Sequence, residues 1–358
     1  MKNEILGCDF VVNLGEERKN TKIKVLQLTD TQVIDAAQRR TPERLRPDEI
    51  SAWDKANFDA QCGDHIRSLI TQTHPDLIIF TGDVIYGSFD DAGTSFDWFC
   101  NLMDSFEIPW APVFGNHDNE AEIGVDWQCN RFAASKYCLF KRGEVSGNGN
   151  YTVGIATGDT LVRVIHMIDS NGCFAATDPS VMKAEVIYPD QLELVRENTR
   201  LIRESQKREV PAFFACHIPL LGFKLAETEK GYYNEQREKY VLGVNVQAQG
   251  EDFGFRFSNY RTIKTDVDII DFLRSVSVDG VFVGHVHNNS TAIDYKGIKW
   301  VFGLKTGQYD HHIPGQLGAT LINLYGDEFT VTHIPSLVHY SPMPGRDPMF
   351  KNFFANED

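Results

Sequence analysis

Residues 110–118 read WAPVFGNHD, an apolar run that stops at Gly115 and is followed by Asn116, His117 and Asp118. The apolar residues predict a buried strand, and the glycine predicts a turn at its end. In open α/β sheets, ligands bind at the edge that the carboxyl ends of the strands form. The stretch therefore predicts a strand that presents three polar side chains at a binding edge.

Other apolar runs of the chain end in the same way. They are LQLTD, LIIFTGD, AFFACH and VFVGHVH, and they end in polar residues that can ligate a metal: Asp30, Asp83, His217, His285 and His287. Mixed carboxylate, amide and imidazole ligation suits manganese, iron or zinc better than calcium. The repeated pattern therefore predicts a metal site at one edge of the sheet.

Asp83 is the predicted bridge between two cations, because a carboxylate has one oxygen for each of them. We expect the first ion to have three further ligands: Asn116, His217 and His285. We expect the second ion to have two: Asp30 and His287. Side chains two residues apart in an extended segment point to opposite faces, so the turn after Gly284 must re-aim the two histidines of GHVH.

Two cations about 3.5–4 Å apart can hold the attacking and leaving oxygens of a displacement at phosphorus and lower the pKa of a shared water. The expected nucleophile is a metal-bridging hydroxide, which needs no serine or cysteine. His117 suits a proton donor to the leaving group or a clamp on the phosphate. Asp118 either holds the His117 imidazole in one tautomer or caps the following helix.

The order of elements predicts one α/β domain over residues 1–358. Strands alternate with helices as far as residue 118, which predicts parallel strands joined by crossover helices. The pattern becomes helical from about residue 48. Short runs broken by Gly and Asn at 137–140, 150–156 and 161–169 predict antiparallel strands. Residues 218–262 are rich in Gly, Tyr and charge and have weak periodicity, so we interpret them as an insertion over the site.

Composition bounds the class of protein. A formal net charge of −15 argues against an extended nucleic-acid surface. No stretch approaches the roughly 18 apolar residues of a membrane span, and the N-terminus lacks the apolar core of a signal peptide. The 7 cysteines are scattered without a CxxC pair, which predicts free thiols in a reducing cytoplasm. The expected partner is a small phosphorylated substrate, with no membrane, nucleic acid or obligate protein partner.

The polar motifs also stand in a familiar order. Asp30, Gly82-Asp83, the GNHD of 115–118, His217 and the GHVH of 284–287 resemble the signature of calcineurin-like metallophosphoesterases. The FTGDVIYG, CHIPL and LKTGQY segments resemble the purple-acid-phosphatase-related branch. The resemblance implies a four-layer α/β/β/α sandwich of two mixed sheets flanked by helices. It also implies two divalent or trivalent transition-metal ions: manganese, iron or zinc.

One position departs from the family pattern. Many members have His two residues after the first Asp, where this chain has Gln32, and an amide oxygen is a poorer ligand than imidazole. Purple acid phosphatases also lack that His and use a Tyr three residues after the second Asp, the spacing at which Tyr86 lies. Gln32 and Tyr86 are therefore candidate ligands. Tyr86 is either a tyrosinate ligand to ferric iron or an aromatic residue in the packing.

The GQYDHH segment contains His311 and His312, which resemble a metal-binding pair, but no motif assigns them. We interpret the segment as a loop that reaches over the pocket, with Tyr309 and His311 as candidate substrate-binding residues beside His117. The expected activity is hydrolysis of phosphomonoesters. A phosphodiesterase, for example for cyclic nucleotides, and a non-catalytic metal-binding scaffold are the alternatives. Gln32 favours the scaffold, whereas His117 and the complete GHVH favour catalysis.

Overall fold

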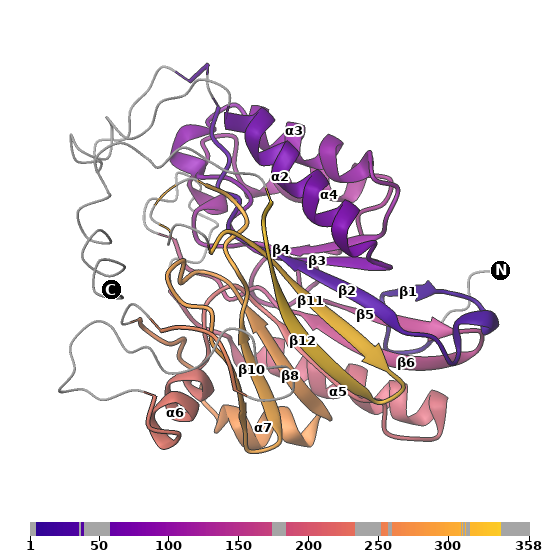
Figure 1. Ribbon diagram of the computed structural model, residues 1–358. Helices are drawn as coiled ribbons and strands as arrows, with labels where there is room; N and C mark the ends of the chain where they lie inside the picture. The colour runs from indigo at the N-terminus through magenta and orange to yellow at the C-terminus, as the bar shows by residue number, and fades with distance from the viewer. Residues whose placement is uncertain are drawn as a thin grey trace, which may run out of the picture.

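The computed structural model describes residues 5–35, 37–38, 58–173, 184–232, 252–256, 260–308, 310, 312 and 316–337. Two β-sheets lie face to face, and helices cover the outer face of each sheet (Figure 1). This is the four-layer α/β/β/α arrangement of two mixed sheets that the sequence predicts.

The smaller sheet has the strand order β12-β11-β2-β3-β4. Its strands are β2 (Ile23–Leu28), β3 (Leu77–Thr81), β4 (Trp110–Val113), β11 (Gly318–Tyr325) and β12 (Glu328–Pro335). Strands β2, β3 and β4 are parallel, and β11 is antiparallel to β2 and to β12. Three helices lie on its outer side: α2 (Phe58–Thr73), α3 (Thr94–Asp104) and α4 (Val125–Ala134).

The larger sheet has the strand order β1-β5-β6-β7-β8-β10-β9. Its strands are β1 (Phe10–Asn13), β5 (Tyr151–Thr157), β6 (Thr160–Met167), β7 (Ala212–Ala215), β8 (Val278–Val283), β9 (Ala292–Tyr295) and β10 (Ile298–Phe302). The central run from β6 to β10 is parallel, whereas β5 and β9 join antiparallel. Its outer helices are α5 (Pro189–Gln206), α6 (Leu221–Glu229) and α7 (Ile269–Ser275).

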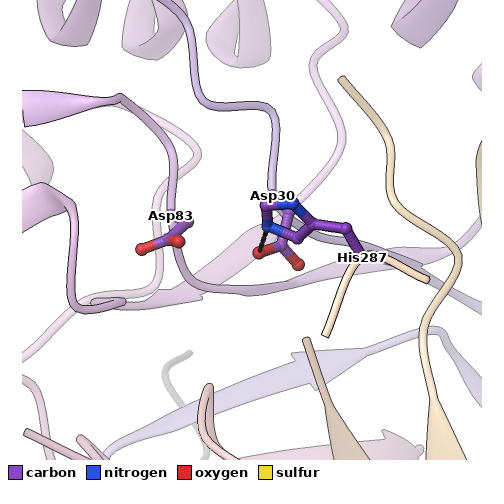
Figure 2. A group of neighbouring side chains, drawn as sticks. All are labelled: Asp30, Asp83 and His287. Carbon is purple, nitrogen blue, oxygen red and sulfur yellow. Dashed lines mark ion pairs between the residues drawn. The ribbon is translucent and has the colours of Figure 1, made fainter. Parts of the chain in front are cut away.

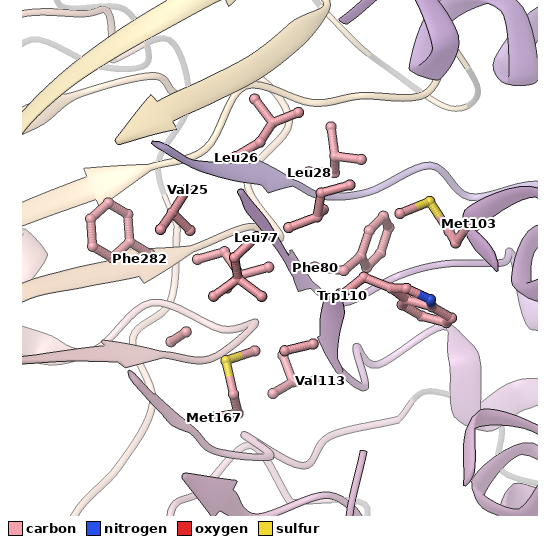
Figure 3. Packing of buried hydrophobic residues seen from close by; sticks show 14 of the residues in the cluster. Val25, Leu26, Leu28, Leu77, Phe80, Met103, Trp110, Val113, Met167 and Phe282 are labelled. Atoms are coloured by element: carbon pink, nitrogen blue, oxygen red, sulfur yellow. The ribbon is translucent and has the colours of Figure 1, made fainter. Parts of the chain in front are cut away.

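The period-2 alternation of the strands divides the core into layers, because successive side chains point to opposite faces. Val25 and Val113 point from the smaller sheet towards Phe282 and Met167 of the larger one (Figure 3). Phe80 points the other way and packs edge-to-face on Phe99 of α3, with ring centroids 5.0 Å apart. Strands β2, β3 and β4 of the smaller sheet are therefore buried on both faces, which holds their carboxyl ends in fixed positions.

Three expectations about elements need correction or lie outside the described residues. The predicted strand over residues 137–140 is reduced to a single bridge between Trp110 and Cys138. Helix α6 lies inside the segment interpreted as an insertion, and weak periodicity gave no sign of it. Within that segment, residues 233–251 and 257–259 lie outside the described residues, so its role over the site stays a prediction. The predicted helix start near residue 48 also lies outside them.

All seven cysteines are free, as the sequence predicts. Four of them are buried, where a thiol packs as a small apolar group: Cys62, Cys100, Cys129 and Cys216. Among the described helices, none combines the length and the apolar character that a membrane crossing requires.

Candidate metal centre

The predicted ligands come from both sheets and meet at one end of the sandwich. Three of them follow strands β2, β3 and β4 of the smaller sheet: Asp30, Asp83 and Asn116. The other three follow strands β7 and β8 of the larger sheet: His217, His285 and His287. Parallel strands present their carboxyl ends at one edge, so each sheet contributes half of the set.

The backbone at this edge adopts an unusual conformation. Asp30, Gln32, Asp83 and His285 have φ angles of 53°, 47°, 55° and 69°, in the left-handed region that non-glycine residues rarely occupy. Such strain is characteristic of functional sites. The left-handed His285 also interrupts the alternation of the strand and thereby re-aims His285 and His287, as the sequence requires.

His217 lies where three atoms with lone pairs meet, which are its own Nε2 and one oxygen each of Asp83 and Asn116. Its Nδ1 lies 2.7 Å from the carbonyl oxygen of Thr81, to which it donates a proton. Its Nε2 then faces Oδ2 of Asp83 at 3.3 Å and Oδ1 of Asn116 at 3.2 Å. Three acceptor atoms in contact need a positive charge between them. Burial lowers the pKa of His217, but the Asp83 carboxylate outweighs it and raises the pKa to about 9, so without a metal a proton takes that place.

Asp30 and His287 form the second pair, which again joins the two sheets. His287 Nε2 lies 3.2 Å from Asp30 Oδ1 (Figure 2). One ligand atom from each of Asp30, Asp83 and His287 lies within 4.8 Å of the others. Burial raises the pKa of Asp30, but the hydrogen bond and charge of His287 outweigh it and bring the pKa down to about 2. Burial likewise raises the pKa of Asp83, and the charges of His217 and His117 reverse the effect.

His285 completes the donor set as a neutral imidazole. Its ring lies edge-on to the His217 ring, with centroids 5.1 Å apart. Burial, followed by the charge of His217, lowers the pKa of His285 to about 3. A metal binds only the neutral form of imidazole. The side chains that converge here therefore fit transition-metal cations, as the sequence predicts.

His117 lies beside this donor set and has a carboxylate partner of its own. Its Nδ1 lies 3.1 Å from Oε2 of Glu120, which also accepts a hydrogen bond of 2.7 Å from Ser88 Oγ. The His117 side chain is 11 % exposed, whereas Glu120 is fully buried. The Tyr86 ring stacks on the imidazole with centroids 4.2 Å apart. The carboxylate and the ring together fix the orientation of a histidine that solvent can reach.

Asp118 has neither of the two roles that the sequence suggested, because its carboxylate does not contact the His117 imidazole and the N-cap of α4 is Gly124. Its Oδ2 accepts backbone N–H groups of Asp83 and Gly115 at 2.9 and 2.7 Å, and its Oδ1 accepts that of Ile85 at 3.0 Å. The carboxylate that contacts His117 belongs to Glu120, so the expectation that Asp118 orients the imidazole is corrected. Burial, followed by the charge of Asp83, raises the pKa of Asp118 to about 7. Asp118 thus shapes the turn that carries Asp83.

Gln32 also differs from expectation. Its Oε1 accepts a hydrogen bond of 2.6 Å from Lys305 Nζ, and its Nε2 donates to Oδ2 of Asp83 at 3.3 Å. An ammonium can only donate, so the amide oxygen must face Lys305. The oxygen expected to bind metal is thus turned towards a cation of the protein. For Tyr86 the contact with His117 is a stacking one, which is the packing alternative.

Three residues at the site escaped the sequence reasoning. Glu120 lies three residues after His117 in a 3-10 turn, η3 (Asp118–Glu120). This spacing was the signal in the sequence that could have indicated the contact between the two side chains. Lys305 is 273 residues from its partner Gln32, so no local signal exists. Asp310 places Oδ2 3.7 Å from His287 Nδ1. The candidate substrate-binding residues Tyr309 and His311 lie outside the described residues and stay predictions.

Comparison with known proteins agrees with this geometry. The calcineurin-like phosphoesterase family profile matches residues 23–289. The probable inactive purple acid phosphatases 28 and 29 of Arabidopsis thaliana are each 26 % identical to the chain, over 70 % and 84 % of its length. Phosphatase DCR2 of Saccharomyces cerevisiae is 26 % identical over 76 % of it.

The chain spans 62 % and 75 % of the two Arabidopsis proteins and 45 % of the yeast phosphatase. The family profile covers well over half of the chain and includes every predicted metal ligand from Asp30 to His287. The chain belongs to the calcineurin-like phosphoesterase family, in its purple-acid-phosphatase-related branch.

Proposed function

We propose that this protein is a binuclear metal-dependent phosphohydrolase that cleaves phosphomonoesters. The observation that supports it most is the convergence of His217 Nε2, Asp83 Oδ2 and Asn116 Oδ1, three acceptor atoms that need a cation between them. Manganese, iron and zinc suit the donor set. Bound ions would supply an activated water at neutral pH and neutralise the charge of the phosphate.

The chain's own residues would perform the remaining tasks. His117 would donate a proton to the leaving alkoxide, or hold a phosphate oxygen, from the imidazole nitrogen that faces away from Glu120. Glu120 would keep the Nδ1 proton in place, and Tyr86 would keep the ring in its plane. Asp118 would hold the Asp83 turn, and with it the bridging carboxylate, in position.

The substrate we propose is a small phosphorylated molecule, and the compartment we propose is the cytoplasm, where the seven free thiols would stay reduced. A phosphodiesterase is the first alternative, because a proton donor such as His117 serves both kinds of ester. Hydrolysis of p-nitrophenyl phosphate and of its bis-ester should be compared in the presence of Mn²⁺. Faster turnover of the bis-ester would overturn the assignment to monoesters.

A non-catalytic scaffold is the second alternative, and two observations favour it. The Gln32 oxygen faces Lys305, and the names of two relatives describe them as probably inactive. The His117→Ala variant separates the possibilities, because no predicted ligand is removed. We expect a loss of about 10²–10⁴-fold in turnover at unchanged metal content. An unaltered rate in a metal-loaded sample would remove the catalytic assignment.

The identity of the ions can be tested on the same preparation. Elemental analysis gives the metal content, and the absorption spectrum of the iron-loaded protein tests Tyr86. A purple charge-transfer band that disappears in Tyr86→Phe would support a tyrosinate ligand. Its absence would leave Tyr86 with the stacking role on His117.

A further inference from the structure

Lys305 is a cation buried beside the candidate metal centre. Its side chain is 2 % exposed, and its Nζ donates to Gln32 Oε1 at 2.6 Å and to the carbonyl oxygen of Asp30 at 2.9 Å. Its own carbonyl accepts the N–H of Gly318 on β11, which fixes the backbone. Hydrogen bonds of the side chain and of the backbone therefore hold the ammonium in one place, three residues beyond the end of β10.

The charge of Lys305 has no direct ion pair. In the parts of the chain that the structure describes, no carboxylate lies within 4.0 Å of its Nζ, and both of its acceptors are neutral oxygens. Burial lowers the pKa of Lys305, and the carboxylates of Asp30, Asp310 and Asp83 oppose this effect through space. Two of these are predicted metal ligands. A buried ammonium needs compensating negative charge, so Lys305 draws on the same carboxylates that a metal ion would use.

Gln32 connects this cation to the metal centre. It stands two residues after Asp30, the position at which many family members have a histidine ligand. Here the amide oxygen faces the ammonium and the amide nitrogen faces Asp83. Neither end is available to bind a cation unless the Lys305 contact breaks. The two residues thus remove one ligand and add one positive charge on the same side of the site.

We propose that Gln32 and Lys305 make the two metal positions unequal, with a loosely held ion on the Asp30–His287 side and a tightly held ion at Asn116, His217 and His285. The proposal rests on the metal centre of the proposed function. A fixed positive charge in a buried region repels a divalent cation, and the missing imidazole removes a coordinate bond. Lys305 is thereby a positioning residue that sets metal occupancy and contacts no substrate.

The test is a calorimetric titration of the chelator-treated full chain with Mn²⁺. Elemental analysis of the desalted protein then gives the number of ions that each chain retains. We expect the wild type to show two affinities at least about tenfold apart, about 1.4 kcal/mol, and to retain one ion per chain. Lys305→Met should tighten the weaker site by about tenfold or more. The double variant Gln32→His with Lys305→Met should retain two ions.

Lys299→Met is the matched control. Lys299 is also nearly buried, at 8 % exposure, but its Nζ pairs with Asp294 at 2.8 Å on the neighbouring strand β9. Its removal should leave both affinities unchanged. If Lys305→Met behaves as Lys299→Met does, the inference is wrong. If Lys305→Met does not fold, the wild-type titration and Gln32→His decide, because Gln32→His should tighten the weaker site and an unchanged weaker affinity in that variant would contradict the inference.

The outcomes also separate this inference from the function. A wild type that binds two ions with equal affinity would overturn the roles of Gln32 and Lys305 and leave the phosphohydrolase assignment standing. A wild type that binds no ion would overturn both.

Discussion

Glu120 Oε2 lies 3.1 Å from His117 Nδ1, and Ser88 donates a hydrogen bond to the same oxygen. The carboxylate is buried, whereas the imidazole is in contact with solvent. This pairing leaves Nε2 as the ring nitrogen that can serve a substrate. It also stabilises the protonated form of the imidazole, which is the form that a proton donor requires.

Glu120→Gln should therefore lower turnover by about tenfold to a hundredfold and leave the metal content unchanged. A neutral amide stabilises the imidazolium less than a carboxylate does, so the alkaline limb of the pH–rate profile should move to lower pH. Glu122→Gln, on the exposed part of the same loop, is the control. A profile that drops in height without moving along the pH axis would contradict this role for Glu120.

Asp118→Asn should destabilise the fold. The Asp118 carboxylate accepts three backbone N–H groups around the turn of Asp83, and an asparagine has only one acceptor oxygen. At least one buried N–H group would lose its partner, at a cost of about 1–3 kcal/mol. Urea denaturation measures the loss in the free energy of unfolding. Wild-type stability together with wild-type metal content would show that the turn does not depend on this carboxylate.

Gly284→Ala tests how closely the two sheets approach at the site. A Cβ at this position would lie 2.5 Å from Oδ2 of Asp30 and would also collide with Thr29 Oγ1. Asp30 would have to move, so we expect loss of bound metal and of turnover. We expect the melting temperature to change little. Gly63→Ala is the control, because in α2 an added Cβ would meet the guanidinium of Arg67 at 3.0 Å and the Trp98 ring at 3.2 Å and no predicted metal ligand. Equal metal content in the two variants would contradict the expectation.

Asp90 predicts a pH dependence of stability away from the metals. It is buried and accepts the N–H groups of Ser95 and Phe96 at the start of α3. Burial raises its pKa from 3.8 to about 6 despite these bonds. Between those two values the unfolded chain releases the proton first, so stability falls as pH rises through this window, by about 3 kcal/mol in total.

Asp90→Asn removes this titration and one acceptor. The variant should be less stable than the wild type at pH 4, and the gap should narrow or reverse by pH 7. Thermal melts of both proteins across that range measure the difference. Parallel stability curves from pH 4 to pH 7 would refute the assignment.

The sequence was sufficient for the sandwich and for the edge at which Asp30, Asp83, Asn116, His217, His285 and His287 converge, because each of these depends on a local pattern. An apolar run that ends in Gly and a polar residue predicts both the strand and the edge at which its ligand lies. The partners of those ligands depend on contacts that no local pattern encodes. Lys305 meets Gln32 only after the two sheets have packed. Glu120, rather than Asp118, meets His117 because the 3-10 turn brings residue i+3 back towards the ring.

Three short contacts of the metal centre join the smaller sheet to the larger one: Asp30 to His287, Asp83 to His217, and Asn116 to His217. A cation held at either place would cross-link the two sheets at this end of the sandwich. Chelation would then do more than stop the chemistry. It would leave the two layers joined at this edge only by the direct contacts between side chains, so removal of the metal should also shorten the lifetime of the folded protein.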